Sequence, residues 1–323
     1  MIAMTYPEDA AQSQGSQPTR RYHKPVLVAE VLNVFEPVAG KLILDGTLGG
    51  GGHTGALLAA GAQVISLDQD PEAIAFAKER LAEFGESFRA VHCNFAEAAE
   101  ALDNLGVSQV DGALLDLGVS SHQIDTPERG FSFQKDGPLD MRMNPKGLIS
   151  AAQLVNTMSA DQLERIFRQY GEERAARKIA ARIARDRMVQ PFTRTLQLAE
   201  AIESVVPRQG KTHPATRVFQ ALRIAVNREL EVLETGLASL TARLTPGGRF
   251  AVITFHSLED RIVKEFFKLR TQEWLDRPEW PAARRNPDHI FRKVTGKAIT
   301  ASDAEQAANA RSRSAKLRAV EKI

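Results

Sequence analysis

The feature that most constrains this chain is a run of four glycines, Gly49 to Gly52, that follows a short apolar segment. Ile43 and Leu44 precede the acid Asp45, and a segment of helical character begins near His53. The pattern indicates a strand, a loop without Cβ atoms and a helix N-terminus. Glycines let a ligand lie against the backbone, and free N–H groups at a helix start favour an electron-rich group. Such a loop after a first strand is typical of a nucleotide-type ligand site in a doubly wound α/β fold.

The glycines alone leave the ligand open. Gly50, Gly52 and Gly55 fit the G-x-G-x-x-G pattern of dinucleotide sites, so NAD is one interpretation. Asp45 favours S-adenosylmethionine (SAM), because an acid there would repel a pyrophosphate but can receive the methionyl ammonium, directly or through water. Asp68 ends the second predicted strand, where it is placed to accept hydrogen bonds from the ribose hydroxyls of either ligand.

Strands and helices alternate along much of the chain. Strands are predicted at 41–45, 64–68, 88–92, 111–116 and 249–255, and helices near 25–35, 53–60, 71–84 and 215–243. Asp70, directly before Pro71, is interpreted as the cap of the third helix rather than as a ligand contact. The alternation predicts a mostly parallel sheet with helices on both faces.

A long gap separates the fourth and fifth predicted strands. It spans about 130 residues, whereas a helical crossover needs only a dozen or more, so we expect an inserted domain after the fourth strand. Its middle has helical periodicity, carried by Ala176, Ile179, Ala180, Ile183 and Ala184. The predicted division is a disordered extension at 1–22, a discontinuous catalytic domain at 23–125 and 214–323, and an inserted helical substrate-binding domain at 126–213.

Positive charge is gathered in three stretches, although the net charge is only +2. Residues 165–187 carry eight basic against three acidic side chains, 207–228 carry five against none, and 311–323 carry five against one. Such segregation favours a polyanionic partner. We take Arg177, Lys178 and Arg182 in the insert as candidate RNA contacts, with a solvated helix face as the alternative.

Other features narrow the class of protein. Cys93 is the only cysteine, which rules out an intrachain disulfide and fits a reducing, cytoplasmic compartment. No apolar run approaches the roughly 18 residues of a membrane span, so no membrane partner is expected. No histidine and cysteine cluster has the spacing of metal ligands, and no metal is expected.

Two predicted strand ends place further polar residues where an α/β sheet binds its ligands. Asp116 ends the fourth strand, and His256 and Ser257 follow the fifth. Here the chain resembles a known family, the bacterial small-subunit ribosomal RNA methyltransferase H family, from about residue 22 onward. The resemblance is carried by 23–27, 45–53, Leu114–Ser121, Glu128–Phe133, Asp136–Met143, Tyr170–Glu173, His213–Arg217, Phe255–Arg261 and Asn309–Arg318.

The resemblance implies a SAM-dependent enzyme with a Rossmann-like sheet that methylates N4 of cytidine 1402 in 16S rRNA of the small ribosomal subunit. It also implies the SAM contacts, namely Gly51, Gly52, His53, Asp68, Phe95, Asp116 and Gln123. The chemistry of some of these residues agrees with that role. The two glycines permit close backbone approach, and Phe95, just past the third strand, can stack on adenine.

The exocyclic amine of cytosine is a poor nucleophile, because its lone pair is delocalised into the ring. A hydrogen-bond acceptor can draw the nitrogen toward sp³ geometry, and Asp116 is the candidate catalytic group for this role. Many amino-methyltransferases follow that acid with two prolines and an aromatic residue, whereas here Leu117 to Ser120 follow it. Asp116 is therefore left open as a SAM contact, an amine contact or both, and His256 is a second catalytic candidate.

Three alternatives are weighed against this prediction. Methylation at C5 of cytosine requires a cysteine that attacks C6, and the only candidate, Cys93, is interpreted as a small buried residue. An NAD-dependent dehydrogenase is supported only by the glycine spacing. A non-catalytic RNA-binding or assembly factor would use the basic insert, but the intact loop and the acids at three strand ends disfavour it. A homodimer is retained as a hypothesis.

Overall fold

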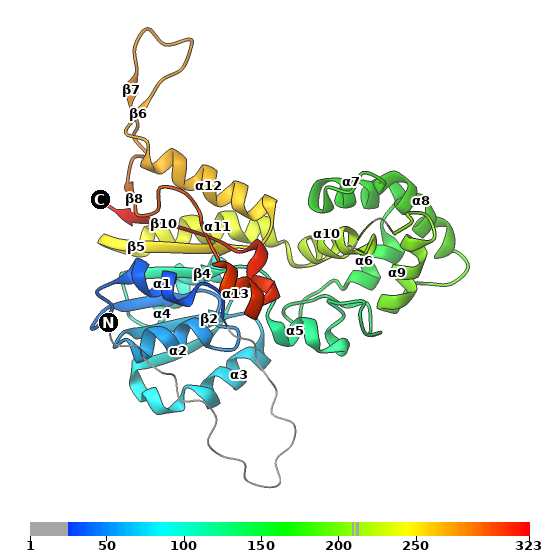
Figure 1. Cartoon of the computed structure of the whole chain (residues 1–323), viewed down its shortest axis with the longest axis horizontal. Helices are drawn as coiled ribbons and strands as arrows, with labels where there is room; N and C mark the ends of the chain where they lie inside the picture. The colour runs from blue at the N-terminus through cyan, green and yellow to red at the C-terminus, as the bar shows by residue number, and fades with distance from the viewer. Residues whose placement is uncertain (1–24, 209, 211–212) are drawn as a thin grey trace.

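The computed structural model describes residues 25–208, 210 and 213–323, so the predicted extension at 1–22 lies outside the described residues. Its centre is one mixed sheet in the order β3-β2-β1-β4-β5-β10-β8 (Figure 1). Five strands run parallel: β1 (Leu42–Asp45), β2 (Gln63–Asp68), β3 (Phe88–His92), β4 (Val110–Asp116) and β5 (Leu244–Thr254). The chain order reverses between β1 and β4, as in doubly wound folds. The predicted Rossmann-like α/β class is confirmed.

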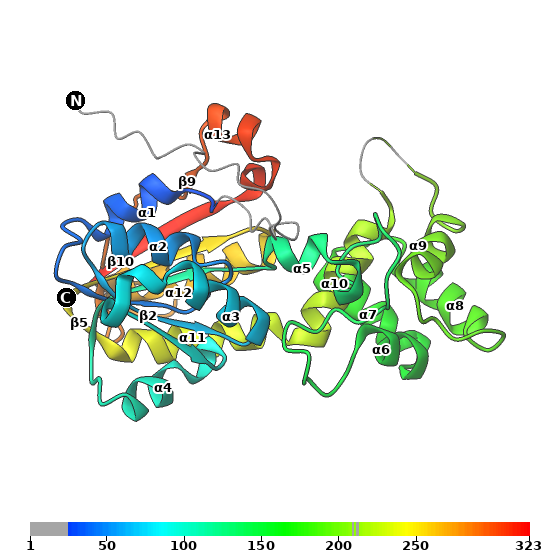
Figure 2. The ribbon, with the colours of Figure 1, turned by 90° about the horizontal axis from the view of Figure 1, so that it is seen from below.

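Helices cover both faces of this sheet (Figure 2). One face packs against α1 (Val28–Phe35), α2 (Gly52–Ala59) and α3 (Pro71–Arg80), and the other against α4 (Ala98–Asn104), α11 (Glu229–Arg243) and α12 (Ser257–Thr271). Side chains alternate along each strand, so Leu114 packs on the face that α1 and α2 cover, and Leu115 packs on the face that α4, α11 and α12 cover. This burial on both faces explains why the strands read as continuous apolar runs.

The chain leaves the sheet after β4 and forms a separate helical body, on the right of Figure 1. It begins with α5 (Ser121–Asp125) and continues through α6 (Ala151–Thr157), α7 (Ala160–Gly171), α8 (Ala176–Asp186), α9 (Thr195–Glu203) and α10 (Ala215–Asn227). Helices α6 to α10 enclose their own apolar core, in which Ile179 and Ile183 are fully buried as the periodicity predicted. We call α6 to α10 the insert. We propose that it is a domain and that it ends after α10, because α10 packs on α7.

The prediction of a single helix at 215–243 is wrong. The chain forms α10 and α11, which are divided at Arg228, a residue with a left-handed backbone (φ 50°). The break has a packing cause: α10 completes the insert core, whereas α11 covers the sheet. The two helices must therefore take different directions, and no glycine or proline marks the place.

The C-terminal segments add strands that the sequence pattern did not predict. Strand β10 (Lys316–Lys322) runs antiparallel between β5 and β8 (Phe291–Lys293), and β9 (Ile299–Thr300) also pairs with β10. Part of the basic tail at 311–323 is therefore a sheet strand. Asp260 on α12 binds two of its cations, Lys316 at 3.1 Å and Arg318 at 2.8 Å. A helix α13 (Asp303–Ala308) precedes this strand.

Candidate functional site

A cavity of about 380 Å³ lies at the carboxyl ends of the five parallel strands, a size in the range of small-molecule sites. Six of the seven predicted cofactor residues line it: Gly52, His53, Asp68, Phe95, Asp116 and Gln123. Gly51 does not line the cavity. It has φ +73°, and a Cβ there would lie 2.9 Å from Leu81, so it lets the glycine loop pack against the C-terminal end of α3. The structure thus brings together residues from loops that are far apart in sequence.

Asp68 connects the glycine loop to the second strand. Its Oδ2 accepts a hydrogen bond from the Gly49 N–H at 2.8 Å, and its Oδ1 accepts one from the Asp70 N–H at 2.8 Å. Each oxygen retains a lone pair that can accept a ribose hydroxyl. Burial raises the pKa of Asp68 to about 6, although the two backbone hydrogen bonds act in the opposite direction.

Asp70 caps α3, as predicted, by accepting a hydrogen bond from the Glu72 N–H. The buried carboxylate also receives the Gln123 amide at 2.9 Å and the Arg129 guanidinium at 2.7 Å. Gln123 in turn accepts the Ser120 N–H, which completes a capping box at the start of α5. Gln123 is therefore a wall residue that ties the loop after β4 to α3.

Asp45 lies behind the cavity wall, and the structure does not bring it into the site. It is buried and accepts hydrogen bonds from the Thr47 N–H at 3.0 Å and the Thr54 hydroxyl at 2.7 Å. The expectation that Asp45 receives the methionyl ammonium is not supported by this geometry. Thr47, which the sequence pattern did not single out, does line the cavity and accepts the Asp116 N–H at 2.7 Å.

Asp116 and His53 face each other at the centre of the site, with 3.4 Å between His53 Nε2 and Asp116 Oδ2. Burial alone would lower the pKa of His53, but the carboxylates of Asp116 and Asp45 outweigh it and the pKa is raised. Asp116 Oδ1 is buried and has no hydrogen-bond partner among the described residues. A buried acceptor without a donor is unfavourable, so this atom is suited to a donor from a bound molecule.

Phe95 approaches the cavity from the start of the segment after β3. A Cβ on Gly236 of α11 would lie 2.3 Å from the Phe95 ring, so only glycine at that position lets the ring lie against this helix. Gly236 therefore sets the place of the aromatic wall. Nothing in the local sequence pattern marked it, because it lies inside a helix.

We call the part of the cavity that is lined from the insert, α11 and α12 its far end. Met143, Arg223, Asn227, Phe255 and Glu259 line it. Arg223 on α10 donates twice to Glu229 on α11, at 2.8 Å each, across the break at Arg228. Asn227 holds the 141–143 loop through the Met143 N–H and the Met141 carbonyl. This end is a polar pocket with two apolar side chains.

His256 does not line the cavity. It is the N-cap of α12 and forms a capping box with Glu259. Donor atoms of Glu229, His256 and Glu259 lie within 4.8 Å of one another, a spacing that a metal ion could use. Both oxygens of Glu229 already bind the Arg223 guanidinium, whose charge opposes a cation. We therefore interpret this group as a charge network that joins three helices.

Cys93 is half-buried rather than buried as predicted, and it lines the cavity near Phe95. Burial raises the pKa of its thiol to about 11, and the nearby acids Glu97, Asp68 and Glu100 act in the same direction. The thiolate is the nucleophilic form of cysteine, so this environment disfavours nucleophilic attack by Cys93.

The three candidate RNA contacts lie on α8 of the insert. Arg177 and Lys178 are exposed on the face opposite the buried Ile179 and Ile183. Arg182 instead forms an ion pair with Asp186, one turn further along the helix. Two of the three cations are thus available to a phosphate backbone.

A glycine loop after β1, an acid after β2, an aromatic residue after β3 and an acid after β4 surround one cavity, and together they define a Rossmann-like SAM-dependent methyltransferase. The family follows from the whole chain rather than from the loop alone. The chain belongs to the MraW methylase family, whose model matches residues 20–323.

Similar proteins were found both by sequence and by structure. Proteins named ribosomal RNA small subunit methyltransferase H are 51% identical in Anaeromyxobacter dehalogenans, over 93% of this chain and 98% of that protein, and 52% identical in Geobacter sulfurreducens, over 93% and 99%. A solved rRNA methylase from Streptococcus thermophilus has a TM-score of 0.41 at 11% identity, over 90% of this chain and 93% of that one. Within the described ranges, no helix has the length and apolar character to span a membrane.

Proposed function

We propose that this protein methylates N4 of a cytidine in the 16S rRNA of the small ribosomal subunit, at the position equivalent to 1402, with SAM as the methyl donor. The observation that carries the proposal is the unpartnered acceptor Asp116 Oδ1 at a cavity lined by Asp68 and Phe95. The names of the relatives, which span nearly the same length, support the RNA substrate.

The cavity has two ends, and we assign one ligand to each. The glycine loop, Asp68 and Phe95 hold SAM, with Asp68 accepting the ribose hydroxyls and Phe95 stacking on adenine. The far end, with Arg223, Met143 and Phe255, receives the target cytosine, because Arg223 supplies hydrogen-bond donors and the two apolar side chains can contact a base.

When bound, SAM supplies an electrophilic methyl group on a sulfonium. Asp116 accepts a hydrogen bond from the N4 amine, which directs the nitrogen lone pair at that methyl group. The proton that N4 loses would pass to Asp116, which His53 Nε2 contacts at 3.4 Å and holds in place. Most of the acceleration comes from holding the two reactants in line, which can supply roughly 7–11 kcal/mol.

The rival products and cofactors can be separated directly. Purified protein is incubated with labelled SAM and small-subunit rRNA, free or in the subunit, and the RNA is digested to nucleosides for mass spectrometry. N4-methylcytidine is expected. 5-Methylcytidine, or no transfer to any of these RNAs, would overturn the proposal. A ligand stabilises the folded protein by RT ln(1 + [L]/Kd), so a melting temperature that rises with SAM but not with NAD excludes the dehydrogenase. Dimerisation and a cytoplasmic location stay predictions.

A further inference from the structure

A short hairpin projects from the end of α12, away from both the sheet and the insert (Figure 1). It pairs β6 (Trp274–Leu275) with β7 (Arg284–Arg285), and we call residues 272–286 the tryptophan hairpin. Both tryptophans of the chain, Trp274 and Trp280, lie in it. Neither the cavity nor the SAM-binding residues include any part of it.

The base of the hairpin is fixed to α12 by Asn286, which is 3% exposed. The side-chain amide of Asn286 donates to the carbonyls of Leu269 at 2.6 Å and Gln272 at 2.7 Å, and its backbone N–H donates to the backbone carbonyl of Glu273 at 2.8 Å. A two-stranded hairpin alone is marginally stable in water, so this anchor is what sets its direction. The outer part is then held in a defined place while its side chains remain at the surface.

The surface of the hairpin combines a flat aromatic ring with cations. Trp274 is 54% exposed and lies directly opposite Arg285, which is also exposed. Trp280 is flanked by the guanidinium groups of Arg277 and Arg284, each 4.9 Å from its ring centroid. These three arginines form no ion pair with any described residue, unlike Lys316 and Arg318 on β10.

We infer that the tryptophan hairpin is a second RNA-binding element, in which Trp274 stacks on an unpaired base and Arg285 contacts the adjacent phosphate. The inference rests on the proposed function, since it takes RNA as the substrate. Glu273, Asp276 and Glu279 balance the three arginines in number, so the hairpin attracts RNA by stacking more than by net charge. Its contribution to binding should therefore depend on salt only through the one phosphate contact of Arg285, whereas the stacking of Trp274 should not.

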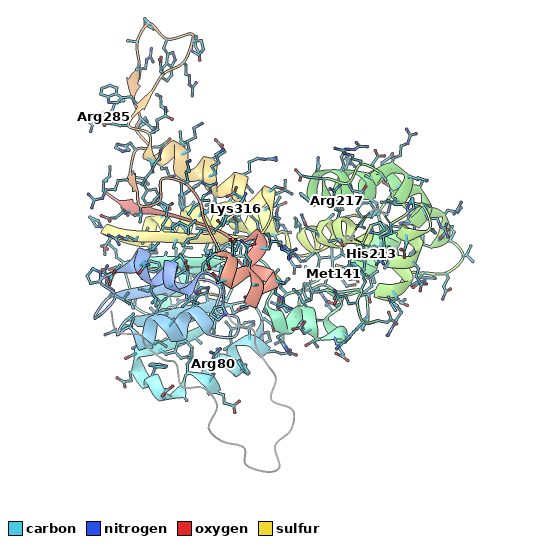
Figure 3. The ribbon with its side chains drawn as sticks, in the orientation of Figure 1. Arg80, Met141, His213, Arg217, Arg285 and Lys316 are labelled. Atoms are coloured by element: carbon cyan, nitrogen blue, oxygen red, sulfur yellow. The ribbon has the colours of Figure 1, made fainter. Side chains whose placement is uncertain are left out.

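The position of the hairpin indicates the kind of RNA that can reach it. In Figure 3, Arg285 lies on the opposite side of the molecule from Arg217 and His213 of the insert region. One RNA that touches both must extend across the methyltransferase domain. A short oligonucleotide around the target base can occupy the cavity and the insert alone, whereas a large folded rRNA can also reach Trp274.

The two tryptophans give a direct readout of this contact. In a Trp280→Phe variant, Trp274 is the only source of tryptophan emission, and we expect folded small-subunit rRNA to change that emission while SAM does not. Trp274→Ala should weaken binding of the folded rRNA by about 5- to 150-fold, the range of base–aromatic stacking, with an unchanged slope of log K against log salt. Arg285→Ala should also weaken binding, through loss of its phosphate contact, and Arg89→Ala, which removes an exposed arginine on β3, is the matched control for that change and should have little effect.

The outcomes separate this inference from the proposed function. If the wild-type protein methylates the rRNA but Trp274 emission and Trp274→Ala affinity do not change, the inference is wrong and the function stands. If Trp274→Ala alters sedimentation of the free protein instead, the hairpin joins two copies of the chain, and the inference is again wrong. If the wild type neither binds nor methylates the rRNA, both fail. A change of emission with weaker binding by Trp274→Ala, at normal SAM affinity, supports the inference.

Discussion

In the wild-type protein, we expect ionisation of Asp68 to lower the stability of the fold and to raise the affinity for SAM as the pH rises. Asp68→Asn is expected to abolish both dependences on pH. The carboxyl has its ordinary pKa of 3.8 in the unfolded chain and a pKa of about 6 in the folded protein, where burial disfavours the charge. A shift of about 2 units corresponds to at most about 3 kcal/mol. Because the folded pKa is the higher one, the protonated carboxyl of Asp68 adds this amount to the free energy of unfolding below pH 3.8. The contribution is lost as the pH rises through 6.

SAM binding should follow the opposite course, because ribose hydroxyls donate to the ionised carboxylate. Wild-type affinity is expected to be constant above about pH 7 and to fall by up to tenfold per pH unit below 6. In Asp68→Asn the affinity at pH 8 should be lower by about 10- to 150-fold, the equivalent of a charge-assisted hydrogen bond of about 1.5–3 kcal/mol, and nearly independent of pH.

Calorimetric titration of SAM and thermal melts between pH 5 and 8, on both proteins, test this reasoning. The amide also places one N–H donor against the Gly49 or Asp70 N–H, so a moderate loss of stability at all pH values is expected. Asp161→Asn, at an exposed site on α7, is the control for a lost carboxylate. A variant with wild-type SAM affinity at pH 8, or with the wild-type pH profile, would refute the assignment of Asp68.

Three further changes test other parts of the site. Asp116→Asn should lower methyl transfer at saturating SAM and RNA by about 10²- to 10⁴-fold with the melting temperature nearly unchanged, and wild-type turnover would remove Asp116 from the reaction. Cys93→Ser should keep its activity and its N4-methylcytidine product by mass spectrometry, whereas a folded but inactive variant would revive C5 chemistry. Replacing Arg177, Lys178 and Arg182 by alanine should flatten the salt dependence of RNA binding by roughly 0.7–0.9 per lost phosphate contact and leave SAM affinity alone. An unchanged slope would contradict the assignment of these three cations as phosphate contacts.

The features that follow from local pattern were predictable from the sequence. Strand ends in a parallel sheet meet at one edge, so the strand pattern alone places Asp68 and Asp116 close together. The same rule misplaced Asp45, because the direction of a side chain at a strand end depends on its partners, and Thr54 on α2 draws this carboxylate inward. Gln123 contacts Asp70, 53 residues away, and no local signal reports such a pairing.

In the C-terminal region, tertiary contacts turn a predicted basic tail into a strand of the sheet. Lys316 and Arg318 alternate with Leu317 and Ala319, which fits a half-buried strand as well as a basic tail. Only the fold supplies Asp260, which forms ion pairs with both cations where the segment joins the sheet. Likewise, the break at Arg228 follows from the two cores that α10 and α11 must cover and not from Arg228 itself.

The placement of the insert has a consequence for the order of folding. Strands β4 and β5 are hydrogen-bonded neighbours, yet their pairing closes a loop of about 130 residues, which costs about 4 kcal/mol of chain entropy if that loop is unstructured. An insert that collapses first around its own core brings the two ends toward each other and reduces that cost. The rate at which the sheet forms should then depend on side chains that never touch it. Phe167→Ala, a cavity in the centre of the insert, would slow refolding of the catalytic sheet.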